Sequence, residues 1–197
     1  MGGVVNISAP YILDPERVLV SGVLILEDIE ISIKPETYKV AVLTGGPILP
    51  IIPLGQGNDY DRQQHNLLVT LQFITTASGL SLTPKNTLLE IDGVATRPTH
   101  SSDTFLKTNP PREAQSAPPG HKWICEGRAA MLNEVLVDTE LAIESRGCIV
   151  MEFPVKTPDT DMQFNIEVRG LKKDGIPILV PKFYFKPGTT IVTSIMG

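Results

Sequence analysis

The chain has 197 residues, of which 42% are hydrophobic, and this length supports one domain with a substantial core. Its 17 basic and 22 acidic residues give a formal net charge of -5, the wrong sign for neutralising nucleic-acid phosphates. Nucleic acid is therefore not expected as a partner. The apolar stretch at 18–26 is interrupted by Ser21 and Gly22 and is much shorter than the roughly 20 residues of a membrane helix. We expect no transmembrane segment.

Short strands are predicted along the chain, because 17 prolines and 16 glycines interrupt it too often for long helices. Residues 27–33 alternate, with Ile29, Ile31 and Ile33 on one face and polar side chains on the other. Residues 66–75 alternate in the same way. This period of two is typical of strands with one buried face.

Polar segments separate these strands. Residues 54–64 form a short polar loop, and residues 97–121 are rich in proline, serine and threonine. We expect the second span to be a long loop without a regular element. Residues 127–137 fit either a short helix or a strand.

The C-terminal third shows the clearest pattern. Residues 148–155 and 164–168 alternate, and Asp174-Gly175 predicts a hairpin turn that leads into a return strand at 176–185. The chain is therefore predicted to be a single all-β domain over 1–197. The expected architecture is an antiparallel two-sheet sandwich, immunoglobulin-like, with at most one short helix.

Residues 178–188 place apolar and aromatic side chains on both faces of the predicted return strand. We expect one face to be buried, with Tyr184 at its boundary. The alternative is an exposed apolar patch for a partner.

Two cysteines, Cys125 and Cys148, are the whole complement of the chain, and they are not spaced as metal ligands. If the chain is exported, they are expected to form one disulfide, and a cross-link of this span stabilises by about 3 kcal/mol. The alternative is two buried thiols in a reducing cytoplasm.

Residues that catalysis would use are present but do not form a recognisable constellation. The sequence from His100 to Asp103 contains histidine, serine and aspartate, yet a hydrolase triad requires side chains brought together by a rigid scaffold. Cys125 lacks an identifiable base. We therefore expect no enzyme activity, and a hydrolase using Cys125 or His100 is the opposing hypothesis.

No cofactor is expected. The loop at 55–61 brings Asp59 and Asp61 close in sequence, but it lacks the spacing and the later glutamate of a calcium-binding loop. A polar loop between strands explains the segment better, and no metal site is predicted.

The segments at 148–154, 164–171 and 174–185 together resemble exported proteins and lipoproteins of Gram-negative bacteria that carry β-sandwich ectodomains. The resemblance rests on strand and turn residues in the last quarter of the chain and carries over no catalytic or ligand-binding residue. It implies a periplasmic or outer-membrane-associated domain, in which Met1 stands where a lipidated cysteine was removed. The lipid anchor would then be lost from this sequence. Free thiols would indicate the cytoplasm instead.

Rigid sheets often bind through the loops that they present. We therefore expect a cell-envelope binding or assembly protein that contacts a protein partner through Asp59, Tyr60, Asp61, His100 and Phe105. An immunity-type inhibitor that masks a toxin with an acidic face is the alternative. A carbohydrate-binding sandwich is a third hypothesis, although an aromatic content of 6% leaves little material for sugar stacking.

Overall fold

The computed structural model describes residues 2–37, 41–43, 66–104 and 132–193. In these ranges the chain forms antiparallel strands and two short 3₁₀ turns, η2 (Pro84–Asn86) and η4 (Val135–Val137), with no α-helix. The all-β prediction is confirmed. The described strands form three sheets, whereas the sequence predicted two.

Sheets A and B contain six strands each and sheet C contains four. The order in sheet A is β5 (Ala41–Leu43), β1 (Gly2–Tyr11), β16 (Phe183–Thr193), β13 (Phe164–Glu167), β8 (Leu88–Ile91) and β9 (Val94–Thr96). The order in sheet B is β10 (His100–Ser101), β12 (Arg146–Lys156), β6 (Asn66–Thr75), β4 (Ile29–Pro35), β3 (Val23–Leu26) and β2 (Leu19–Val20). The order in sheet C is β11 (Leu141–Ile143), β7 (Leu80–Leu82), β14 (Leu171–Lys173) and β15 (Ile176–Pro177).

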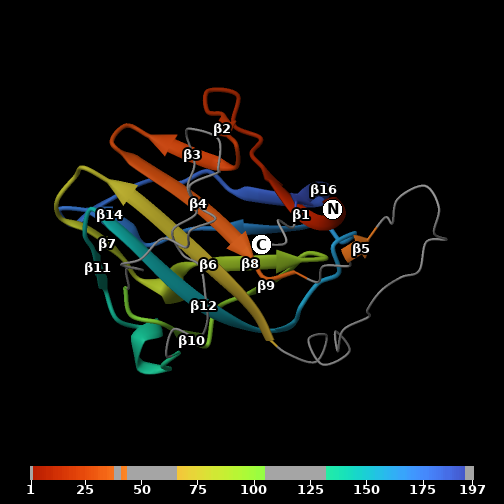
Figure 1. The fold of residues 1–197 in the computed structure, drawn as a ribbon. Helices are drawn as coiled ribbons and strands as arrows, with labels where there is room; N and C mark the ends of the chain where they lie inside the picture. The colour runs from red at the N-terminus through yellow and green to blue at the C-terminus, as the bar shows by residue number, and fades with distance from the viewer. Residues whose placement is uncertain (1, 38–40, 44–65, 105–131, 194–197) are drawn as a thin grey trace, which may run out of the picture.

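The layers enclose one hydrophobic core. Figure 1 shows the long strands β4, β6 and β12 of sheet B running diagonally across the view, with β1 and β16 of sheet A behind them and sheet C at the left. All three sheets contribute to a single cluster of buried side chains. Its largest fully buried members are Phe73 and Phe153 from sheet B and Phe183 and Phe185 from sheet A. Burying one face of each sheet makes the fold sandwich-like.

Local sequence patterns located several elements well. The predicted strand at 66–75 matches β6 (Asn66–Thr75), and the three isoleucines of the 27–33 pattern are buried in β4. Asp174 and Gly175 have φ values of 50° and 79°, the left-handed region that a tight hairpin turn requires. The turn therefore forms where the sequence placed it.

Two segments differ from the prediction. The return strand expected at 176–185 is divided between β15 in sheet C and β16 in sheet A, because the chain changes sheets between Pro177 and Phe183. The span at 97–121 also begins with ordered structure, since β10 (His100–Ser101) pairs with β12 and Ser101 is buried. The ambiguous segment at 127–137 contains η4 within its described part.

Candidate functional site

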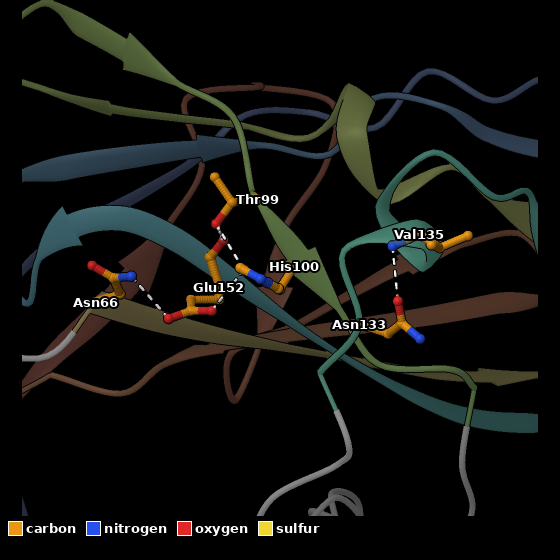
Figure 2. A network of polar contacts seen from close by, with 6 residues as sticks. All are labelled: Asn66, Thr99, His100, Asn133, Val135 and Glu152. Atoms are coloured by element: carbon orange, nitrogen blue, oxygen red, sulfur yellow. Dashed lines mark hydrogen bonds and ion pairs between the residues drawn. The ribbon is translucent and has the colours of Figure 1, made fainter.

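His100 lies in a polar network on β10 and β12, shown in Figure 2. Its Nδ1 atom is 3.0 Å from Oε2 of Glu152, directly opposite in the β10–β12 register, and 3.1 Å from the hydroxyl oxygen of Thr99. The Asn66 amide donates a hydrogen bond of 2.9 Å to the other Glu152 carboxylate oxygen. The His100 side chain is 40% exposed, so this is a surface network that ties β10 to the sheet.

The serines beside His100 have structural hydrogen bonds. The Ser102 hydroxyl accepts a hydrogen bond of 2.9 Å from the Val150 backbone N–H, and the Ser101 hydroxyl donates one of 3.0 Å to the Ser102 carbonyl. Both side chains are almost completely buried. Neighbouring residues on a strand also point to opposite faces, which separates His100 from Ser101. These contacts explain the ordered start of the predicted loop and do not assemble a triad.

Of the other residues predicted at the site, the structure describes Cys148 alone. Cys148 is fully buried in β12. Asp59, Tyr60, Asp61, Phe105 and Cys125 lie outside the described residues, as do the loops at 54–64 and 105–121.

An open cavity of about 400 Å³ lies between sheets B and C, which we call the cleft. One wall is the β3–β4 turn of sheet B, and the other is the segment that follows the β14–β15 hairpin of sheet C. Its apolar lining comes from Ile25, Leu26, Ile29, Pro177, Ile178 and Leu179.

Exposed apolar side chains collect around the cleft. Leu179 is 81% exposed, Ile176 is 70% exposed, and Ile25 projects from β3 between buried neighbours. Val18 is also exposed and follows Arg17 in the chain, and the Arg17 guanidinium donates a hydrogen bond of 3.1 Å to the Leu179 carbonyl. The apolar side chains at 25–29 and 177–179 therefore form the rim of the cleft.

Four charged side chains line the cleft, and most of them form ion pairs. The Lys173 ammonium is 3.0 Å from the Asp28 carboxylate, and this hydrogen bond lowers the pKa of Asp28 and raises the pKa of Lys173. Arg17 likewise forms an ion pair with Asp14 at 3.7 Å. The cleft thus combines apolar side chains with two ion pairs and with the Glu27 carboxylate, which has no ion pair among the described residues.

Sequence reasoning missed most of this site. In the sequence, the alternative of an exposed apolar patch at 178–188 was the one indication of this site. The structure divides that segment between exposed and buried side chains. Leu179 is exposed, whereas Val180, Phe183 and Phe185 are buried, and Tyr184 lies at the boundary as predicted. The opposite wall, around Ile25, had no separate signal, because an isolated exposed isoleucine is ordinary.

Comparison of the chain with protein-family models, with curated proteins and with solved structures found no match. Within the described ranges, no group of three or more histidine, cysteine, aspartate or glutamate side chains is arranged to hold a metal ion. No helix in the same ranges is long and apolar enough to cross a membrane.

Proposed function

We propose that this chain is a non-catalytic binding or assembly module of the cell envelope, and that it contacts a protein partner through the rim of the cleft. The observation that carries the proposal is the presence of exposed apolar side chains, led by Leu179 and Ile25, in the lining of an open cavity. Contiguous exposed apolar surface of this kind is typical of interaction sites.

The chemistry of the rim favours a partner with apolar anchor residues. The ion pairs of Asp28 with Lys173 and of Arg17 with Asp14 leave Glu27 as the one charged side chain of the described cleft lining without an ion pair, so the surface has little unbalanced charge to attract a charged ligand. An apolar side chain of a partner would remove Leu179 and Ile25 from water, which is the main source of binding energy at the centre of protein interfaces.

His100 lies far from the cleft within sheet B. It belongs to β10 at one edge of the sheet, whereas β2 and β3 are at the other edge, beside the cleft. Contacts through His100 and the loops remain a prediction, separate from the cleft.

Photo-crosslinking in the native host tests the use of the cleft. A crosslinking residue replacing Leu179 or Ile25 is expected to form an adduct with one defined partner, identified by mass spectrometry. With that partner purified, Leu179→Asp is expected to weaken binding at least about tenfold, because a charge then enters the apolar contact.

Val94 and Val135 provide matched controls, since they are 67% and 73% exposed but do not line the cleft. Crosslinking from these positions and Val94→Asp should leave the partner and its affinity unaffected. Equal adducts from Val94, no adduct from either cleft position, or unchanged affinity of Leu179→Asp would each contradict the proposal.

The envelope assignment is supported by the resemblance of the C-terminal segments to exported Gram-negative proteins and by the pair Cys125 and Cys148. Cys148 is fully buried, and no free cysteine is found among the described residues. We expect no titratable thiol in denatured, non-reduced protein isolated from its native host, because the two cysteines would be bridged in an oxidising compartment. Reduced protein serves as the control and should give two thiols; two thiols without reduction would place the chain in the cytoplasm.

A further inference from the structure

The face of sheet A that is turned away from the core carries a row of aromatic and polar side chains. On β16, Phe183 and Phe185 are buried, so Tyr184 between them points to the opposite face. On β13, Phe164 and Ile166 are likewise buried on either side of Asn165. Tyr184 and Asn165 are both half-buried, and thus accessible in part to solvent.

The strand register aligns four residues across this face. Tyr11 on β1 is opposite Tyr184, Tyr184 is opposite Asn165, and Asn165 is opposite Glu90 on β8. Directly opposed residues project from the same face of a sheet. With strands about 4.8 Å apart, the row from Tyr11 to Glu90 spans about 14 Å.

The two tyrosines form an aromatic pair. Their ring centroids are 5.5 Å apart with an angle of 29° between the ring planes. The Lys186 ammonium lies 5.2 Å from the centroid of the Tyr11 ring. Because β1 and β13 pair with opposite edges of β16, Tyr11 flanks Tyr184 on one side and Asn165 flanks it on the other.

Polar groups continue the row beyond the aromatic pair. Within the described residues, the Asn165 amide has no hydrogen-bond partner, so its donor and acceptor atoms are available to a ligand. The Glu90 carboxylate is 3.3 Å from the Lys182 ammonium, and these side chains are 37% and 32% exposed. Their opposite charges offset each other at this end of the row, while Lys186 places one positive charge at the Tyr11 end.

We propose that this row binds a neutral saccharide chain. A pyranose ring presents C–H groups that pack against an aromatic ring and hydroxyl groups that need donors and acceptors, and Tyr184 with Asn165 and Glu90 supplies both. A span of about 14 Å accommodates a short oligosaccharide. An anionic polymer that follows the row from Tyr11 to Glu90 fits less well, because Lys186 attracts it only at the Tyr11 end and the Glu90 carboxylate, which offsets Lys182, would repel it at the other.

The position of the tyrosines matters more for sugar stacking than the aromatic content of 6%. The aromatic content gives the number of rings in the chain, whereas the stacking of a sugar on a ring depends on where that ring lies in the fold. Of the four tyrosines, the β1–β16 register brings two into contact. The row belongs to sheet A, whereas the cleft is formed by sheets B and C, so the two proposals stand independently.

The test is calorimetric titration of the full chain with three neutral probes: cellohexaose, maltohexaose and chitohexaose. At least one probe is expected to bind with a Kd of about 1 mM or tighter. Asn165→Ala should weaken that binding about fivefold to tenfold, since a hydrogen bond to a sugar hydroxyl is lost. Asn66→Ala removes an amide from sheet B instead and should leave the affinity unchanged.

Tyr184 provides a second pair of variants. Tyr184→Ala is expected to abolish measurable binding, whereas Tyr184→Phe keeps the ring and should stay within about twofold of the original affinity. If Tyr184→Ala does not fold, Asn165→Ala and Tyr184→Phe still decide the question. No binding of any probe at about 5 mM, or unchanged binding by Asn165→Ala, would overturn the proposal. Binding that is lost on Leu179→Asp would place the saccharide in the cleft and would also overturn it.

Discussion

Phe73→Ala is expected to lower the free energy of unfolding by about 3–5 kcal/mol. Phe73 is fully buried in β6, the strand between β4 and β12 in sheet B. Its register partners are Ile31 on β4 and Gly147 on β12. Since Gly147 has no side chain to move into the space, truncation at Phe73 leaves a cavity that the surrounding residues fill only in part.

Urea denaturation followed by circular dichroism measures this change. Phe73→Leu retains most of the buried volume and should cost less than half as much, while Val94→Ala at an exposed site should change stability by less than about 0.5 kcal/mol. A loss below about 1 kcal/mol for Phe73→Ala would show that the residue is not in a tightly packed core.

Gly170→Ala has the second largest expected effect, a loss of about 2–4 kcal/mol of folding free energy. Gly170 has a φ of 83°, a conformation that residues with a side chain rarely adopt. A Cβ atom there would also lie 3.0 Å from the Thr83 carbonyl oxygen and 2.9 Å from atoms of the Asn86 side chain. In Gly170→Ala the strained backbone conformation and the steric clash of the Cβ atom would therefore both destabilise the fold.

Gly93 and Gly175 separate these two causes. Both have a φ of 79°, but nothing lies within 4 Å of a Cβ atom added to either. Gly93→Ala and Gly175→Ala should therefore show only the conformational cost of about 1–2 kcal/mol, measured by the same urea denaturation. Equal losses at all three glycines would refute the role assigned to close packing at Gly170.

The position of Gly170 connects this packing to the proposed binding surface. It lies between β13 of sheet A and β14 of sheet C, where the chain passes from one sheet to the other. Beyond it, β14 carries Lys173 to within 3.0 Å of Asp28 at the cleft. A change at Gly170 that shifts β14 should therefore also disturb the wall of the cleft.

Features that depend on near neighbours could be predicted from the sequence. The alternation of Ile29, Ile31 and Ile33 gave the buried face of β4, and residues 66–75 gave the bounds of β6. The turn at Asp174-Gly175 was equally clear, because the left-handed conformation of both residues is a local property. The alternation of apolar residues with a period of two, together with the residues at the turns, was therefore enough to predict an all-β fold.

The tertiary structure alone decided how these strands combine. Residues 97–104 were too polar to predict as structured, yet the Ser102 hydroxyl and backbone bind β12, which stabilises the segment from outside it. The return strand at 176–185 divides because its two ends pair with different sheets. Neither outcome can be read from the segment itself.

Both proposed surfaces depend on the same kind of long-range contact. Arg17 reaches the Leu179 carbonyl across 162 positions of the chain, and Lys173 reaches Asp28 across 145. Tyr11 meets Tyr184 only because the β1–β16 register brings them together. Strand alternation determines which side chains share a face, but register determines which of them touch. Register follows from the packing of the whole core, so the sequence determined the elements and the tertiary structure determined the surfaces.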